Sequence, residues 1–135
     1  MRSVSLEWTG EGLRFTGKGV EPGSPSVTID GDNAGGASPM QHLLLAAASC
    51  AAIDVVLILQ KMRVALAGLS VTATGRRREE PPRRFEAIDL RFAATGKEVD
   101  PGRVERAVAL SVEKYCSVLH SLAADIAVTT SVDVH

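Results

Sequence analysis

A long apolar segment constrains the fold of this chain more than any other feature. No glycine or proline interrupts residues 40–62, and nearly every residue from Leu43 to Leu59 is apolar. Ser38 suits an N-cap, Pro39 suits the first helical position, and Gln41 completes a capping-box pattern with Ser38. We therefore expect a central helix over residues 38–62. Because it is apolar on nearly every face, we expect protein to enclose it on all sides.

This expected helix is long for a chain of 135 residues. About 24 helical residues span roughly 36 Å, which a small domain has difficulty surrounding. A second copy of the chain would supply the missing cover, and the five alanines around Cys50 would let another helix approach closely. A membrane span is the less favoured interpretation, because the apolar run has only 17 residues and contains Asp54.

The composition of the chain argues against some classes of function, namely nucleic-acid and membrane binding. The length predicts one domain, and the net charge of −1 provides no general attraction for nucleic acid or an anionic membrane. Aromatic residues make up only 4%, which leaves few surfaces for stacking bases. The basic cluster between Arg76 and Arg84 contains two glutamates, so we interpret it as a solvated hairpin tip.

The remaining segments predict an α+β domain with mainly antiparallel pairing. Short strands are expected within residues 1–36, at Ser3–Thr9, Leu13–Gly17 and Ser26–Asp30. A β-hairpin is expected over 64–95, a second helix over 100–123 and a C-terminal strand over 125–134. The second helix has Asp100 as its expected N-cap and Pro101 at its first position. One buried face of that helix is expected to hold Val104, Ala107, Val108, Ser111, Val112 and Tyr115.

The two cysteines are the strongest chemical signal. Cys50 lies in the apolar helix, and Cys116 borders the predicted buried face of the second helix. Two thiols that can reach each other would support reversible sulfur chemistry, whereas the alternative is two small core residues. Residues 1–8 lack the apolar run of a signal peptide, so we expect reduced thiols and a cytoplasmic location.

The cysteine contexts resemble those of the OsmC/Ohr family of thiol-dependent peroxidases. The segment from Ala37 to Cys50 is similar to the family's first-cysteine helix, with Pro39 eleven residues before Cys50. The run Tyr115-Cys116-Ser117-Val118 is similar to its second-cysteine site. Ser-Pro-Met at the helix start, with Lys-Tyr-Cys-Ser-Val, is closest to the YhfA-like branch.

The resemblance implies an intertwined homodimer, with sheets wrapped around long central helices and active sites at the interface. It implies a stress-response oxidoreductase with peroxiredoxin activity, which needs no cofactor or metal. Cys50 would be oxidised by an organic hydroperoxide to a sulfenic acid, Cys116 would resolve it, and an external dithiol would reduce the disulfide. The family's catalytic arginine comes from the N-terminal hairpin, where Arg14 is the nearest candidate.

Activation of Cys50 is where the chain departs from the peroxidase pattern. That subgroup has glutamate directly after the helix-start proline, and here the position is Met40. A buried cysteine in an apolar helix needs a nearby cation or hydrogen-bond donor to form its thiolate. Arg14 is one candidate, His42 is a second candidate across a dimer interface, and His120 could act on Cys116.

Other interpretations remain for these residues. Arg14 could be a strand-surface arginine, His42 could face solvent, and His120 could be structural. Asp54 could pair with a buried cation or lie at a cavity edge. The whole chain could instead be a non-enzymatic OsmC-like protein that holds a small apolar or sulfur-containing ligand at the dimer interface. A metal site is disfavoured, because the spacing of a zinc motif is absent.

Overall fold

The fold is a mixed α+β arrangement with two three-stranded sheets, as expected from the sequence. The structure, a computed structural model, describes all residues from Met1 to His135. The chain divides into two compact units, Met1–Leu43 and Leu44–His135. A single OsmC-like domain over residues 1–135 therefore stays a prediction.

The first unit contains an antiparallel sheet with one apolar face. Its strands are β1 (Val4–Trp8), β2 (Arg14–Gly19) and β3 (Ser26–Asp30), paired in chain order. Across the sheet, Leu6 lies opposite Gly17 and Gly17 opposite Val27. Leu6, Trp8 and Val27 are all more than half exposed. Within the first unit, an apolar face of the sheet is therefore uncovered.

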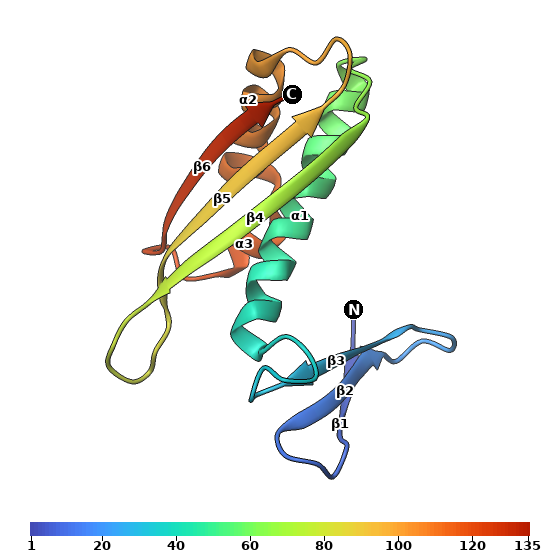
Figure 1. The fold of residues 1–135 in the computed structure, drawn as a ribbon, viewed down its shortest axis with the longest axis vertical. Coiled ribbons are helices and arrows are strands. Elements are labelled where there is room, and N and C mark those ends of the chain that lie inside the picture. Colours follow the sequence, from blue (N-terminus) through green and yellow to red (C-terminus); the bar gives the residue numbers. More distant parts are fainter. The chain divides into compact units, whose positions relative to one another are not determined.

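The second unit contains a mixed sheet with β5 at its centre. Strands β4 (Gly68–Arg77) and β5 (Phe85–Thr95) form the expected antiparallel hairpin, and β6 (Ala127–Val134) pairs with β5 in parallel (Figure 1). Ile88, Leu90 and Phe92 alternate along β5 and are almost completely buried. Asp89 and Arg91 point to the opposite face, as the two-residue period of a strand requires.

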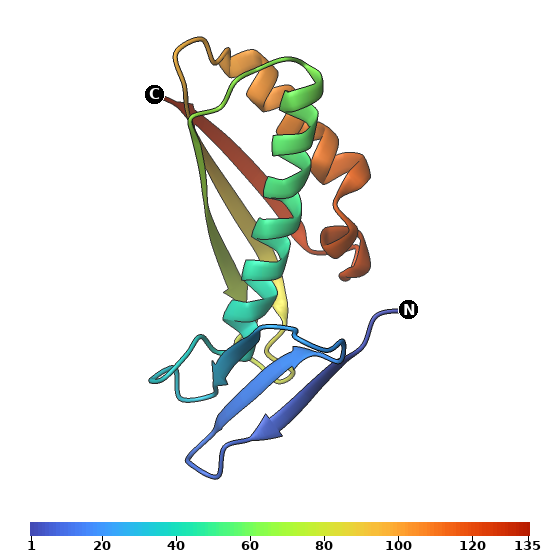
Figure 2. The ribbon, with the colours of Figure 1, turned by 90° about the vertical axis from the view of Figure 1, so that its right-hand side faces the viewer.

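Helices cover the apolar face of this second sheet. Figure 2 shows α1 (Pro39–Lys61) and α2 (Pro101–Leu110) on the same side of β4, β5 and β6. The buried residues of α1 recur at helical spacing and form one stripe: Ala47, Ala48, Ala51, Val55 and Leu59. The core of the second unit therefore lies between this stripe, the buried face of α2 and the inner face of the sheet.

The other face of α1 is apolar but uncovered. Leu45, Ile53 and Leu57 are each more than half exposed, so the expected enclosure on all sides is not achieved within one chain. By length and composition α1 also resembles a membrane span. However, one of its faces packs in the core, and Asp54 accepts a hydrogen bond from Ser111. This packing is that of a core helix.

Both predicted helix starts are confirmed. The Ser38 backbone N–H donates to Gln41 Oε1 at 2.9 Å, and the Gln41 N–H donates to Ser38 Oγ at 3.3 Å, which is a capping box. At α2, the Asp100 side chain accepts a hydrogen bond from the Gly102 N–H, and Pro101 occupies the first helical position. The helices therefore begin where the sequence places them.

The segment predicted as a second helix over 100–123 is divided, and a separate short helix starts at Ser117, where a short turn or helix is expected. After α2 the chain widens into a π-helical turn, η1 (Ser111–Tyr115), and α3 (Ser117–Ser121) follows. Cys116 lies between them with extended backbone angles, so its prediction as a helical residue is wrong. Tyr115 is also wrongly predicted as buried, since it is about half exposed. The wider turn changes the helical register, which carries Tyr115 off the face shared by Val104 and Val108.

Candidate functional site

The second unit brings the two cysteines together. Both are free thiols; Cys116 is completely buried and Cys50 is half-buried. Cys50 lies in α1, at the edge between its buried stripe and its exposed apolar face. The Cys50 thiol is among the groups that raise the pKa of Cys116, so the two thiols are close enough to interact. The proximity expected from the sequence is thus present within one chain.

Cys116 is held in a setting that favours its protonated form. Burial raises the pKa of its thiol above the ordinary value, and the Cys50 thiol adds to that effect. The backbone N–H groups of Leu119 and Val118 act in the opposite direction, but burial dominates. At neutral pH, Cys116 is therefore a neutral thiol.

Asp54 and Ser111 form a partly buried hydrogen bond that the sequence did not reveal. The Ser111 hydroxyl donates a hydrogen bond to Asp54 Oδ2 at 2.8 Å, across 57 residues of sequence. Ser111 has no exposed surface. Of the two alternatives for Asp54, a buried cation or a cavity edge, neither names this partner, which is a serine. The only sequence signal was a serine on the predicted apolar face of the second helix.

Arg14 belongs to the first unit and is tied to a buried carboxylate. Its Nε lies 3.5 Å from Asp30 Oδ2, and its Nη1 lies 3.9 Å from Glu11 Oε2. Its guanidinium lies against Gly35, where an added Cβ would come within 2.5 Å of three of its atoms. Arg14 is thus more constrained than an ordinary strand-surface arginine.

Asp30 organises the loop that holds Arg14. Its carboxylate accepts hydrogen bonds from the backbone N–H groups of Asp32 and Gly35, at 2.9 and 2.8 Å. These bonds, with the nearby Arg14 charge, lower the pKa of the buried carboxyl. Asp30 is consequently ionised at neutral pH and forms an ion pair with the Arg14 guanidinium. Sequence reasoning missed this residue, because an aspartate before a glycine-rich segment is typical of an ordinary turn.

The two candidate histidines occupy different settings. His42 is near the start of α1, and its Nε2 lies 3.3 Å from the Thr28 carbonyl oxygen, a contact within the first unit. Its role toward a thiol stays a prediction. His120 lies on α3, where its backbone N–H donates to the Cys116 carbonyl at 3.1 Å. Its exposed side chain lines a cavity instead of standing free on the surface.

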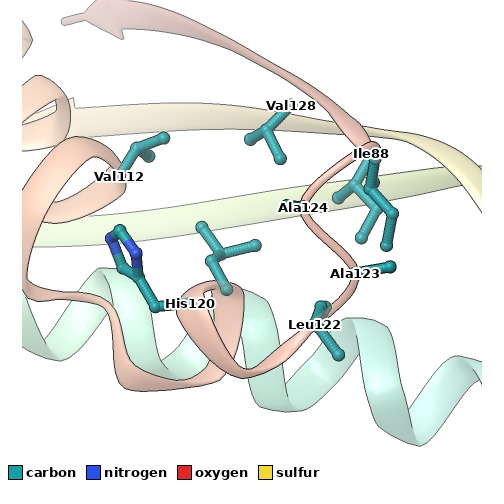
Figure 3. A pocket seen from close by; sticks show the side chains of 9 residues that line it. Ile88, Val112, His120, Leu122, Ala123, Ala124 and Val128 are labelled. Carbon is teal, nitrogen blue, oxygen red and sulfur yellow. The ribbon is translucent and has the colours of Figure 1, made fainter.

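The side chains that line this cavity are apolar apart from His120. Its volume is about 250 Å³, and Figure 3 shows His120 and Val112 at one end and Ile88 and Ala124 at the other. Leu119 connects the cavity to the thiol site, because it lines the cavity while its backbone N–H favours the Cys116 thiolate. The second cysteine therefore has a small apolar cavity beside it.

A family model described as "OsmC-like protein" matches residues 30–131. The chain belongs to the OsmC-like family. Protein YhfA of Escherichia coli K12 is 43% identical over 130 residues, which cover 96% of this chain and 95% of that protein.

Solved structures agree with this assignment. A hypothetical protein from Aquifex aeolicus VF5 has 32% identity and a TM-score of 0.83, with 100% of this chain and 98% of that one covered. The organic hydroperoxide resistance protein OhrB of Bacillus subtilis has 12% identity and a TM-score of 0.65, with 98% of both chains covered. The OhrB likeness shows a shared fold. Membership of the OsmC-like family and similarity to YhfA were both expected from the cysteine segments.

Proposed function

We propose that this protein is a thiol-dependent peroxidase that reduces organic hydroperoxides. The observation that carries the proposal is the interaction between Cys50 and Cys116, which come from segments 66 residues apart in sequence. Two free thiols that lie close enough to interact are suited to reversible disulfide formation. The fold shared with an organic hydroperoxide resistance protein supports the same reaction class.

Cys50 is the proposed nucleophile. Its thiolate attacks the terminal oxygen of the hydroperoxide, the O–O bond breaks, and the leaving alkoxide takes a proton to become the alcohol. Cys50 is better suited than Cys116 to meet the substrate, because Cys50 is half-buried while Cys116 has no exposed surface. Apolar residues surround Cys50 on α1, which favours alkyl hydroperoxides over hydrogen peroxide.

Cys116 is the proposed resolving residue. As its thiol gives up its proton, the Cys116 sulfur attacks the Cys50 sulfenic acid. The S–S bond forms, the S–O bond breaks, and the leaving hydroxide takes the proton and departs as water. An external dithiol then reduces the disulfide and is itself oxidised, which restores both thiols. The raised pKa of Cys116 supports this division of roles, because a neutral thiol does not compete with Cys50 for the peroxide.

Arg14 is the proposed source of positive charge for the Cys50 thiolate. A cationic group beside a cysteine lowers the pKa of the thiol and raises its reactivity. The ionised Asp30 and the glycine-rich loop fix the Arg14 guanidinium, as a pre-organised charge requires. His42 is the weaker candidate, because its ring already contacts the Thr28 carbonyl.

We further propose that the active form is a cytoplasmic homodimer. One chain leaves two apolar surfaces uncovered: the β1–β3 face with Leu6 and Trp8, and the α1 face with Ile53 and Leu57. Exposed apolar surface of this kind marks interaction sites, and a second copy would cover the same surfaces on both chains. The two free thiols support a reducing compartment.

The direct experiment is stopped-flow oxidation with cumene hydroperoxide in the parent and two serine variants. Cys50→Ser is expected to lose the fast reaction, because the nucleophile is gone. Cys116→Ser is expected to react at a similar rate but to stop at a sulfenic acid that dimedone traps. Ser121→Ala, on α3 near Cys116, is the matched control and should behave as the parent. A Cys50→Ser protein that reacts as fast as the parent would refute the proposed nucleophile.

The cavity beside His120 favours a second candidate function, the binding of a small apolar ligand. Eight of its lining residues are apolar, and one imidazole supplies a polar contact, which is the usual composition of a ligand site. Fluorescence of an added apolar dye should fall in Val128→Phe, which fills the cavity. Dye binding with no hydroperoxide reaction in the parent would favour this alternative.

A further inference from the structure

Ser111 connects the two cysteine-bearing segments through two different atoms. Its hydroxyl donates to the Asp54 carboxylate at 2.8 Å, and Asp54 lies one turn after Cys50 on α1. Its backbone carbonyl accepts the Cys116 N–H at 2.7 Å, the bond that closes the π-helical turn. A chain of two short hydrogen bonds therefore runs from the turn after Cys50 to the backbone of Cys116.

A hydrogen bond between a carboxylate and a serine costs more desolvation free energy than a purely structural contact needs. A carboxylate within an apolar helix loses hydration, and one hydroxyl donor replaces only part of it. Two apolar side chains at positions 54 and 111 would pack α1 against η1 without that cost. A polar pair is directional and an apolar pair is not. The distance and angle of a hydrogen bond are met in only one register of the two helices.

The π-helical turn makes that register matter for Cys116. Such turns occur mostly as single insertions in α-helices, often at functional sites. Here the turn begins at Ser111 and ends at Cys116, which leaves the helical geometry. The hydrogen bond from Ser111 to Asp54 on α1 thus sets where Cys116 lies along α1.

We propose that Asp54 and Ser111 are positioning residues for the Cys50–Cys116 disulfide: their hydrogen bond holds α1 and η1 in the register that keeps the two thiols next to each other. The inference rests on the cysteine pairing in the proposed function. Without this bond, α1 and η1 sample other registers, and disulfide formation must first restore the productive one. The effective concentration of one thiol at the other then falls by about tenfold, as expected for the loss of one partly buried hydrogen bond to a charged group.

Equilibration with glutathione buffers tests this inference without any peroxide. Two protein thiols and one glutathione disulfide give the protein disulfide and two glutathiones, so the equilibrium constant reports the effective concentration. Ser111→Ala is expected to lower that constant by about tenfold. Asp54→Asn retains an acceptor oxygen and Ser111→Thr retains a hydroxyl, so both should stay within about twofold of the parent.

A double variant separates positioning from stability. Asp54→Leu with Ser111→Ala replaces both partners by apolar groups, which need not destabilise the fold. It should unfold at about the same urea concentration as the parent and still show the tenfold lower constant. Ser121→Ala removes another serine hydrogen bond, from Ser121 Oγ to the Ser117 carbonyl, and should leave the constant unchanged.

The outcomes distinguish this inference from the proposed function. An unchanged glutathione equilibrium in both Ser111→Ala and the double variant overturns the positioning role, even where the parent reacts rapidly with hydroperoxide. A parent that forms the disulfide in glutathione but ignores hydroperoxides refutes the peroxidase and leaves the positioning role intact. A parent that forms no Cys50–Cys116 disulfide in any glutathione buffer overturns the inference directly.

Discussion

Replacing Ile53 by glutamate should dissociate the proposed homodimer. Ile53 lies on the uncovered face of α1 and is 59% exposed in the single chain. Complete burial of an isoleucine side chain contributes about 1.5–3 kcal/mol, so covering the exposed part contributes about 1–2 kcal/mol in each copy. A two-fold axis repeats the loss in both chains, which gives about 2–4 kcal/mol for the dimer.

This free energy predicts a measurable change in the dissociation constant. Each 1.4 kcal/mol is a factor of ten, so the constant should rise by roughly 30- to 700-fold. The value is a lower bound, because the new carboxylate would also lose hydration in an apolar interface. Sedimentation velocity over a dilution series measures the constant for the parent and for Ile53→Glu.

A matched control separates dissociation from unfolding. Ala109→Glu places the same charged side chain at an exposed position of α2 and should leave the dissociation constant unchanged. Ile53 is exposed within one chain, so each Ile53→Glu protomer should keep the circular dichroism spectrum of the parent. A parent that sediments as a monomer at all concentrations, or an Ile53→Glu protein that dimerises as tightly as the parent, would refute the account of the uncovered face.

Three further predictions concern stability. Phe92→Ala should lower the free energy of unfolding by about 3–5 kcal/mol in a urea titration, because Phe92 is almost completely buried, whereas the exposed Arg91→Ala should change it by less than about 0.5 kcal/mol. Because the pKa of Cys116 is raised in the folded state, the Cys116 thiol ionises in the unfolded chain first as pH rises. The free energy of unfolding should therefore fall above about pH 8.5. An equal fall at alkaline pH in Cys116→Val would contradict this. Because the pKa of Asp30 is lowered in the folded state, its ionised carboxylate stabilises the fold above the ordinary pKa of an aspartate, and this contribution is lost as pH falls through the folded pKa. Asp30→Asn should therefore lose less stability in acid than the parent. An equal loss in the two proteins would contradict this prediction.

The sequence was sufficient for elements whose signals are local. The capping box of Ser38 and Gln41 lies within four residues, and it fixed the start of α1 correctly. The alternation along β5 likewise identified its buried face before any pairing was known. Because α1 is apolar on all faces, the sequence predicted that protein would surround it completely. Ile53 and Leu57 are exposed, so they mark the face of α1 that other protein does not contact.

The sequence was not sufficient where a tertiary contact overrides local periodicity. From Val104 to Ser111 the helical spacing holds, and those predicted core residues are buried. Beyond Ser111 the chain enters a π-helical turn, so the same spacing placed Tyr115 in the core by mistake. Neither segment alone shows that Asp54 and Ser111 will meet, because their hydrogen bond depends on how two distant helices pack.

Mass spectrometry of the protein after one equivalent of organic hydroperoxide tests the central claim most directly. The account predicts the loss of two hydrogens and a peptide crosslink between Cys50 and Cys116 within a single chain. An unchanged mass, or oxidation of Cys50 to sulfinic acid without that crosslink, would contradict it.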